Sequence, residues 1–319
     1  MRVAALAVMV AFYLAGVLLL SLSTYRERER DIEPNAIRNI GADRGRSTGG
    51  LFRRPRLRWC THLKYKQQPS PVSNGLFSGQ FSSSSSSSTN PVNNSEKPVA
   101  LVSFPGSGNT WMRYLLQQAT GILTGSVYKD HGLMKSGFPA EQVKNNSVLV
   151  VKTHEWGNDA RSQFSKAILL VRSPADAILA EFNRQSGGHI GFASIGRYKR
   201  AKGKYWQQFV TDKLWTWEQT NLDWGKNFTG PVEIVHFEKL VENVEGTLRK
   251  LLQFLEYPID ESLLSCAVSR KEGIYRRSKK LNNFDPYSAE MKQALTKKRE
   301  IVYKQLGIEI NNATNTNPS

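Results

Sequence analysis

The feature of this sequence that most constrains its fold is a short apolar run followed by a loop of small residues and a helical pattern. Residues 99–102 are apolar, residues 103–110 read Ser-Phe-Pro-Gly-Ser-Gly-Asn-Thr, and apolar residues recur at helical spacing from Trp111 to Ala119. A strand, a glycine loop and a helix N-terminus in this order can bind phosphate, because backbone N–H groups and the helix dipole converge on an anion. The same pattern also occurs as an ordinary strand-to-helix turn, so the loop alone leaves both interpretations open.

Further apolar runs alternate with amphipathic patterns along the next two hundred residues. The expected strands are 147–151, 167–171 and 232–237, and the expected helices are 175–182, 206–217, 238–254 and 286–306. The expected helix 206–217 carries a largely aromatic stripe at helical spacing, which we expect to lie in the core. The stripe consists of Trp206, Val210, Leu214 and Trp217. This alternation predicts an α/β fold, a P-loop-like parallel sheet flanked by helices on both faces. A basic, glycine-rich stretch, 186–204, is expected to be a mobile loop.

Polar clusters follow three of the expected strands directly. They are the loop at 103–110, Lys152-Thr153-His154-Glu155 and Arg172-Ser173-Pro174. In a parallel sheet a ligand binds beyond the carboxyl ends of the strands, so these clusters should meet at one edge. Their convergence favours the phosphate-site interpretation of the loop.

These residues resemble the sulfotransferase superfamily, which transfers sulfonate from 3′-phosphoadenosine-5′-phosphosulfate (PAPS). The first family motif is matched by Ser103, Phe104, Pro105, Ser107, Gly108, Thr110 and Trp111, the second by Lys152, Thr153 and His154, and the third by Arg172 and Pro174. The segment 232–255 is similar to a later family segment. Three phrases are also similar to the sulfotransferase-like domain of the WSC-domain-containing (WSCD) proteins: Phe-Pro-Gly-Ser-Gly-Asn-Thr-Trp (104–111), Ala-Glu-Phe-Asn-Arg (180–184) and Phe-Asp-Pro-Tyr (284–287). Two cysteines are too few for the WSC modules themselves.

The resemblance implies a PAPS-dependent sulfotransferase fold and roles for individual residues, with PAPS as co-substrate and no metal. The loop would hold the 5′-phosphosulfate through Pro105, Gly106, Ser107, Gly108, Asn109 and Thr110, with Trp111 flanking adenine or lying in the core. Arg172 would hold the 3′-phosphate, helped by Ser173 or Arg184. Arg276 and Arg277 would close over the nucleotide, although a solvated basic face explains them equally well.

Sulfonyl transfer requires a base for the acceptor hydroxyl and charge compensation on the sulfonate. We assign His154 as the base, since a neutral imidazole accepts protons near pH 7. Lys152 lies two residues earlier, on the same side of the strand end, and would place positive charge on the sulfonate. Glu155 is the alternative base.

Two positions depart from the superfamily pattern. The loop lysine of the superfamily is replaced by Gly106, which removes the positive charge that normally interacts with the leaving phosphate. A serine that contacts the 3′-phosphate is replaced by Ala180. The sequence therefore supports two functions, a sulfotransferase and a non-catalytic nucleotide- or glycan-binding membrane protein. A P-loop small-molecule kinase is disfavoured, because no segment supplies a loop Lys followed by Ser/Thr.

The flanking segments suggest a membrane-anchored architecture. Residues 3–22 are uncharged and almost wholly apolar, and twenty residues span roughly 30 Å as a helix, the thickness of a bilayer core. We expect an N-terminal transmembrane signal anchor at 1–24, with a cleaved signal peptide as the alternative. A flexible serine-rich stem at 25–97, a sulfotransferase-like domain at 98–310 and a disordered tail at 311–319 would follow.

Charge by itself gives an ambiguous orientation. The arginines that follow the apolar segment would place the body in the cytoplasm by positive-inside counting. The WSCD resemblance implies instead a single-pass, type II Golgi protein with a lumenal catalytic domain that sulfates sialic acid on glycans. Four glycosylation sequons occur, at Asn93, Asn145, Asn227 and Asn312, but about three are expected by chance in such a sequence.

Composition narrows the possible partners. The chain has 44 Lys and Arg against 27 Asp and Glu, for a net charge of +17, which favours anionic partners. Zinc-finger spacing, RNA-binding aromatic motifs and heptad basic regions are absent from the sequence, so nucleic acid is not expected. The expected partners are a glycan or other hydroxyl acceptor and the lipid bilayer. The two cysteines, Cys60 and Cys266, permit one disulfide without requiring it.

Overall fold

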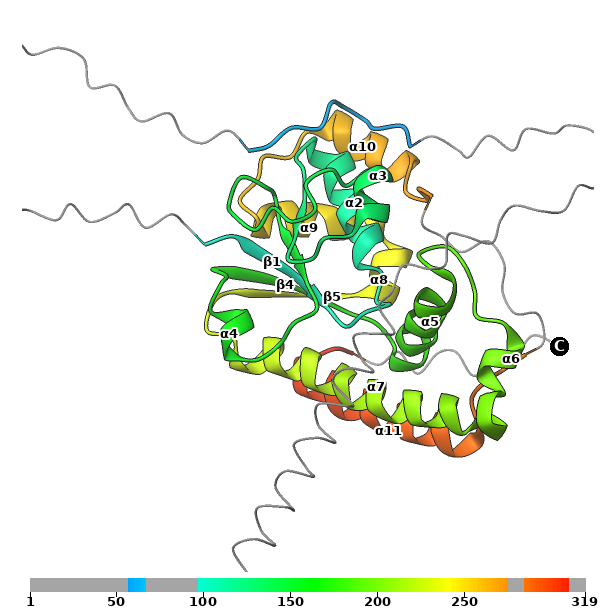
Figure 1. Cartoon of the computed structure of the whole chain (residues 1–319). Coiled ribbons are helices and arrows are strands. Elements are labelled where there is room, and N and C mark those ends of the chain that lie inside the picture. The colour runs from blue at the N-terminus through cyan, green and yellow to red at the C-terminus, as the bar shows by residue number, and fades with distance from the viewer. Residues whose placement is uncertain (1–56, 67–96, 275–283, 310–319) are drawn as a thin grey trace, which may run out of the picture. The chain divides into compact units, whose positions relative to one another are not determined.

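In the computed structural model of the chain, the described residues are 57–66, 97–274 and 284–309, drawn in colour in Figure 1. Within them one five-stranded sheet has the order β2-β3-β1-β4-β5, and every pairing is parallel. The strands are β1 (Val99–Ser103), β2 (Gly125–Ser126), β3 (Val151–Thr153), β4 (Lys166–Val171) and β5 (Val232–His236). The expected parallel α/β sheet is confirmed.

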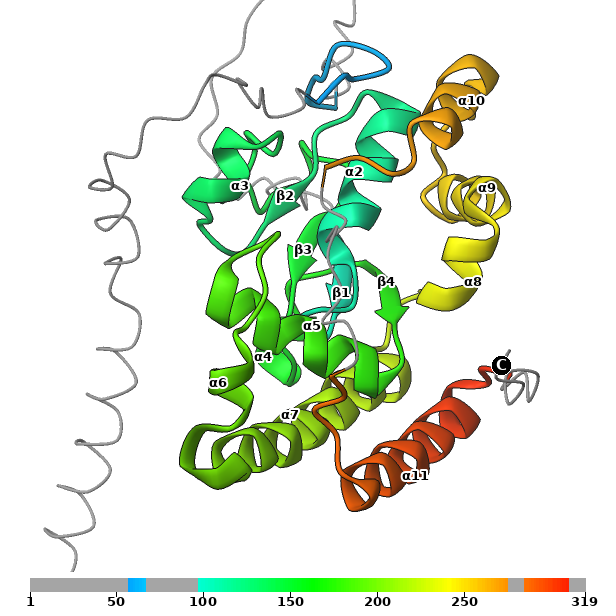
Figure 2. The ribbon, with the colours of Figure 1, turned by 90° about the vertical axis from the view of Figure 1, so that its right-hand side faces the viewer.

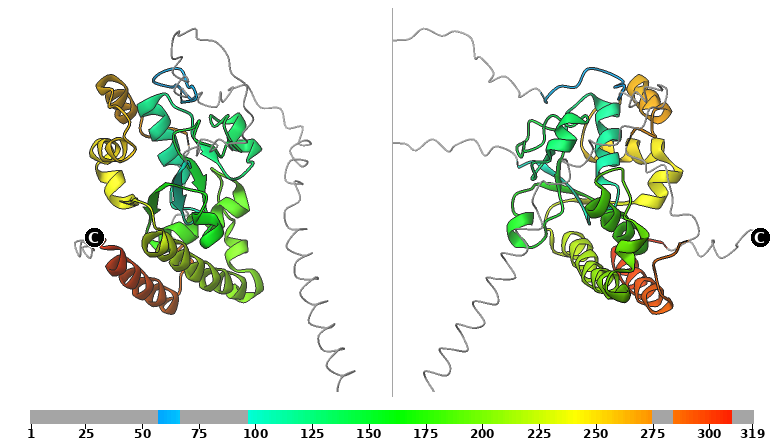
Figure 3. Two further views of the ribbon diagram at one scale, coloured as in Figure 1. Left: turned by 90° about the vertical axis from the view of Figure 1, so that its left-hand side faces the viewer. Right: turned by 45° about the vertical axis from the view of Figure 1, so that its right-hand side comes forward.

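Helices cover both faces of the sheet, which explains why the central strand β1 and its neighbour β4 are almost entirely apolar. One face carries α2 (Asn109–Thr120), α9 (Val244–Phe254) and α10 (Glu261–Ser269), and the other carries α5 (Pro174–Gly187), α7 (Lys204–Leu222) and α11 (Ala289–Leu306) (Figure 1). Figures 2 and 3 show α7 and α11 side by side. Shorter elements are α3 (His131–Lys135), α4 (Asn158–Arg161), α6 (Ile195–Tyr198), α8 (Phe237–Glu242), the 3-10 turn η2 (Arg200–Gly203) and the π-turn η3 (Asp223–Asn227).

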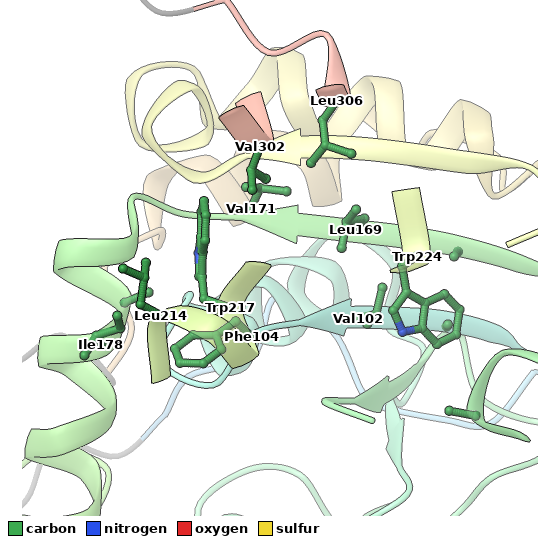
Figure 4. Packing of buried hydrophobic residues seen from close by; sticks show 14 of the residues in the cluster. Val102, Phe104, Leu169, Val171, Ile178, Leu214, Trp217, Trp224, Val302 and Leu306 are labelled. Atoms are coloured by element: carbon green, nitrogen blue, oxygen red, sulfur yellow. The ribbon is translucent and has the colours of Figure 1, made fainter. Parts of the chain in front are cut away.

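The core beneath α7 and α11 is rich in aromatic side chains. Figure 4 shows Trp217 and Trp224 packed with aliphatic side chains of β1, β4 and α11. Both tryptophans are 0% exposed, and Trp217 donates its indole N–H to the backbone oxygen of Arg172 at 3.0 Å. The four residues of the expected aromatic stripe on α7 are all buried. This core therefore ties α7 to the carboxyl end of β4.

The strand boundaries differ from the sequence-based expectation near the third apolar run. The sequence predicts a strand at 147–151, but β3 is Val151–Thr153, so Lys152 lies within the sheet. The two-residue strand β2, which pairs with β3 at the sheet edge, has no counterpart among the expected strands. An edge strand of two residues has no recognisable alternation, and its pairing depends on the neighbouring strand.

Three further segments differ from the sequence-based expectation, two of them expected helices and one an expected loop. The expected helix 238–254 is two helices, because Asn243 interrupts it and its side chain caps α9 by accepting from the N–H of Gly246. The expected loop 186–204 contains the end of α5, α6 and η2. The final helix begins at Ala289, after the N-cap Ser288, instead of at residue 286.

Residues 57–66 fall within the expected flexible stem, yet they pack on the domain. Cys60 is joined to Cys266 of α10 by a disulfide, with a Cα–Cα distance of 5.9 Å. Lys64 forms a parallel bridge with Ile122, and the backbone N–H of Cys60 donates to the Gln118 side-chain oxygen at 2.7 Å. We name residues 57–66 the strap. The strap therefore belongs to the folded domain, although it precedes residue 98, where the sequence predicts the domain to begin.

The expected anchor (1–24), most of the expected stem and the expected tail (311–319) lie outside the described residues. The same holds for Arg276, Arg277, Asn93 and Asn312. Among the helices at 57–66, 97–274 and 284–309, none combines the length and the apolar character that a bilayer crossing needs.

Candidate functional site

The loop between β1 and α2 is held in a conformation that only glycine adopts easily. Gly106 and Gly108 have φ angles of +86° and +97°, and Gly108 is the N-cap of α2. A Cβ at Gly106 would lie 2.2 Å from the backbone oxygen of Ala177, and one at Gly108 would lie 2.5 Å from the Phe237 ring. The loop is therefore pressed against α5 on one side and against Phe237 on the other. Helix α2 points its first N–H groups, which lack acceptors within the helix, toward this loop.

Two side chains at the loop and the start of α2 are buried, and each has a polar atom without a hydrogen-bond partner among the described residues. Asn109 donates through Nδ2 to the backbone oxygen of Leu101 at 3.1 Å and to Ser103 Oγ at 3.2 Å, which fixes the start of α2 on β1. Within the described residues, Ser107 Oγ and Asn109 Oδ1 have no hydrogen-bond partner, although Ser107 is only 1% exposed. Buried polar atoms are nearly always bonded. Their lack of a partner indicates a ligand or water at the loop.

Arg172 brings a partly buried cation to the same loop from the end of β4. Its Nη1 donates to the backbone oxygen of Gly106 at 3.0 Å, and its guanidinium lies 4.4 Å from the centre of the Phe237 ring. Its Nε is buried and has no partner among the described residues. Burial lowers the pKa of Arg172 from its usual value, although an arginine stays protonated. The free Nε and the orphaned Ser107 hydroxyl fit an anion such as a nucleotide phosphate.

The other expected nucleotide residues lie around this loop. Pro105 is in the loop, Thr110 is in the first turn of α2, and Ser173 is the N-cap of α5, with its backbone N–H donating to Glu238 Oε1 at 3.1 Å. Trp111 donates its indole N–H to the backbone oxygen of Lys271 at 2.6 Å and lies edge-on to the ring of Phe237. Trp111 therefore positions the segment that leads toward Arg276 and Arg277.

His154 lies directly after β3, with its ring fixed in one tautomer. Its Nδ1 lies 2.7 Å from the backbone oxygen of Ser103, so Nδ1 must carry the proton and donate it. Within the part of the chain that the structure describes, Nε2 has no hydrogen-bond partner, so its lone pair is free. Burial, followed by the nearby positive charge of Lys152, lowers the pKa of His154 to about 3. The imidazole is therefore neutral at physiological pH and can accept a proton.

Lys152 is a buried cation without an ion pair among the described residues. It is 8% exposed, and its ammonium lies 5.5 Å from the centre of the Tyr128 ring. Burial, followed by the charge of Arg113, lowers its pKa to about 8. A buried, unpaired ammonium is costly unless an anion completes the site. Lys152 and His154 have even spacing on an extended segment, so they face the same side.

Tyr128 is a site residue that sequence analysis missed. Its ring stacks on the His154 imidazole with centroids 5.6 Å apart, and its hydroxyl accepts from the backbone N–H of His154 at 3.0 Å. The same hydroxyl donates to Glu155 Oε1 at 2.8 Å. Glu155, the alternative base, is thus engaged by Tyr128. The sequence signal for Tyr128 is weak, since it consists of a position two residues after the short strand β2.

Arg184 and His189 lie on the His154 side of the site. Arg184 makes a two-pronged bond to Glu181, at 2.6 and 2.7 Å, which raises the pKa of Arg184. Its charge contributes to the lowered pKa values of Lys152 and His154. His189 contacts Asp130 through Nε2 at 2.8 Å, which ties the segment after α5 to the start of α3. Arg184 is thus engaged by Glu181, and a 3′-phosphate role for Arg184 stays a prediction.

Comparison with known proteins identifies related chains. A family model described as "Sulfotransferase domain" matches residues 96–307. A WSCD family member of Aedes aegypti is 55% identical over 316 residues, covering 96% of both chains, and one of Drosophila melanogaster is 57% identical over 255 residues, covering 80% of both. A solved mouse sulfotransferase, SULT7A1 complexed with PAP, has a TM-score of 0.45 and 13% identity, covering 66% of this chain and 85% of the other.

Substitution of Gly106 tests the packing of the loop. We expect Gly106→Ala and Gly106→Lys to destabilise the protein by about 2–5 kcal/mol, because the left-handed φ costs about 1–2 kcal/mol and overpacking against α5 adds about 1–3 kcal/mol. Gly203→Ala is the matched control, since Gly203 has the same φ of +86° and no atom lies within 4 Å of the position that a Cβ would take there. Thermal melting would measure all three. Equal melting temperatures for Gly106→Lys and Gly203→Ala would contradict the contact of the loop with α5.

Proposed function

Because this chain belongs to the sulfotransferase domain family and, within it, to the WSCD family, we propose that it transfers sulfonate from PAPS to a carbohydrate hydroxyl. The observation that supports this best is the pairing of a neutral imidazole, His154, with an unpaired buried ammonium, Lys152, beside a loop with orphaned polar atoms. PAPS supplies the sulfonate and a phosphate leaving group when it is bound.

The donor site that we propose consists of the loop, the start of α2 and Arg172. The N–H groups at the start of α2 and the Ser107 hydroxyl would hold the 5′-phosphosulfate. Arg172 would hold a second phosphate through its free Nε, while its contact with Gly106 keeps the guanidinium in place. Trp111 would contribute by holding the segment at Lys271 over this side of the site.

His154 acts in this proposal as the general base. Its Nδ1–H is committed to the backbone oxygen of Ser103, so Nε2 is the atom that takes the acceptor proton. A pKa of about 3 makes a weak base, but the main charge that lowers it is that of Lys152. An anion bound beside Lys152 offsets that charge and raises the pKa of His154. Donor binding would thus activate the base.

Lys152 replaces, in our proposal, the lysine that the superfamily carries in the loop. Gly106 has no room for a side chain, because α5 occupies that space. Lys152 reaches the same region from β3 and is held beneath Tyr128. Its charge would compensate the sulfonate as negative charge develops in the transition state.

The acceptor that we propose is sialic acid on a glycan. Membership of the WSCD family supports this choice, as do the cations Lys152 and Arg184, which suit an anionic sugar.

We also propose that the domain faces the Golgi lumen behind an N-terminal anchor. The Cys60–Cys266 disulfide supports a non-cytosolic location, because disulfides persist in oxidising compartments.

A transfer assay tests the function. The full-length chain, incubated with labelled PAPS and a sialylated glycan, should sulfate the glycan, and His154→Ala should lower the rate by about 10²–10⁴-fold through loss of the base. His62→Ala, an exposed strap residue, should retain full activity. Donor binding by calorimetry without any transfer by the wild type would instead support a non-catalytic binding protein. Full activity of His154→Ala would exclude His154 as the base.

The pH dependence tests the role of Lys152. We expect kcat/KM for PAPS to fall as pH rises above about 8, because the free enzyme then loses the Lys152 proton. Below this pH the ammonium is charged, and His154 stays neutral down to about pH 3. Initial rates between pH 5 and pH 10 measure this profile. In Lys152→Arg the fall should disappear, since guanidinium stays protonated; an unchanged alkaline limb would place the titrating group elsewhere.

Glycan occupancy tests the orientation. Asn145 and Asn227 are exposed, and Asn145 Oδ1 accepts from the Ser147 hydroxyl within its own sequon. If the domain is lumenal, we expect attached glycans to slow the chain on a gel, and endoglycosidase should remove this shift. The double variant Asn145→Gln with Asn227→Gln should show a smaller shift. A full-length chain in microsomes that shows no shift and is digested by external protease would contradict a lumenal domain.

A further inference from the structure

Two tryptophans lie exposed against one another, and one of them follows the candidate base by two residues. Trp156 is 40% exposed and Trp215 is 55% exposed, and their rings meet edge to face with centroids 5.7 Å apart. The other tryptophans of α7 and η3, Trp206, Trp217 and Trp224, are at most 2% exposed. Folding accounts for the buried ones. An exposed pair of large aromatic rings is costly in water and commonly marks a binding surface.

The position of Trp156 relates this pair to the reaction centre. Trp156 follows His154 by two residues, which limits the distance between their Cα atoms to about 7 Å. An acceptor whose hydroxyl meets His154 Nε2 must extend over neighbouring surface. The segment after β3 therefore offers Trp156 as one of the first side chains beyond the reacting hydroxyl.

The backbone on both sides of Trp156 is anchored. The indole N–H of Trp224 donates to the backbone oxygen of Glu155 at 2.9 Å, and the backbone N–H of Gly157 donates to Asp223 Oδ2 at 2.7 Å. Asp223 also forms an ion pair with Arg161, at 3.3 Å. Trp156 is thus presented from a fixed segment, which suits a binding surface because little conformational freedom is lost on contact.

Trp215 is held with similar rigidity. It lies on α7 between Leu214 and Trp217, both of which are buried. Since those side chains fix the rotation of the helix, Trp215 is directed away from the core and toward Trp156. The two rings come from segments far apart in sequence, so tertiary packing alone forms the pair.

The charges around the pair differ from those at His154. An exposed carboxylate lies three residues from each tryptophan in sequence: Asp159, in α4, follows Trp156, and Asp212 precedes Trp215 by about one turn of α7. The groups that act electrostatically on His154 are cations, with Lys152 and Arg184 among them. An anionic sugar is therefore favoured at His154, whereas the two aromatic rings suit an uncharged one. Aromatic faces attract the C–H groups of an uncharged sugar ring, and the nearby carboxylates can accept hydrogen bonds from its hydroxyls.

We infer that Trp156 and Trp215 form an acceptor subsite that stacks against an uncharged sugar adjoining the residue that receives the sulfonate. This inference rests on the proposed transfer to a glycan. It assigns the pair to substrate selection: the reacting sugar is held by the cations, and its neutral neighbour is held by the aromatic pair.

Kinetics of two acceptors test the subsite in the full-length chain. With 3′-sialyllactose, whose lactose supplies the uncharged sugars, Trp156→Ala and Trp215→Ala should each raise KM by about five- to tenfold. With free sialic acid, and for PAPS, KM should not change. Trp156→Phe should keep most of the affinity, because it retains an aromatic face. Tyr65→Ala, at a strap residue that is 47% exposed, is the control for loss of an exposed ring.

A binding measurement separates failure of the subsite from failure of the proposed function. Saturation-transfer NMR with unreactive lactose should show contact to the wild type and to His154→Ala, and loss of contact in Trp215→Ala. Trp215 is an exposed helix position where alanine is a good helix former, so this variant should fold. Lactose contact without any sulfonate transfer would overturn the function and keep the subsite. Unchanged KM values in both tryptophan variants, with transfer intact, would overturn the subsite.

Discussion

The candidate site depends on the close approach of the loop after β1 to helix α5 and Phe237. At Gly106 and Gly108 there is no room for a Cβ, and both residues adopt positive φ angles. This contact fixes the height of the loop above the sheet and brings the backbone oxygen of Gly106 to Arg172. Because α5 begins two residues after Arg172, one packing contact positions the loop, the partly buried guanidinium and the helix together.

That constraint also explains where the positive charge of the site lies. A loop pressed against a helix backbone cannot carry a long side chain at Gly106, so a cation must reach the site from another element. Lys152 does so from within β3, where burial lowers its pKa and Tyr128 covers it. His154, on the same face, is kept neutral largely by burial and by this neighbouring charge. The electrostatic state of the base therefore depends on the position of the lysine.

Much of the fold and part of the site were predictable from the sequence. The strands β1 and β4 are almost entirely apolar because helices cover both faces of the sheet, and this pattern is visible in one dimension. The polar clusters after the strands could be assigned to one edge because parallel strands end together. The strand β2, the strap 57–66 and the break at Asn243 could not be predicted. Each depends on a partner distant in sequence or on a single capping bond.

The sequence by itself determined the alternation of strands and helices, the glycine loop and the polar residues at the strand ends, because these follow from local periodicity and from parallel topology. Only the tertiary structure decided how those residues act on one another. The pKa of His154 depends on burial and on Lys152, and its tautomer depends on the backbone oxygen of Ser103. The exposed contact of Trp156 with Trp215 joins the segment after β3 to α7. Burial, hydrogen-bond partners and through-space charge exist only once distant segments have packed together.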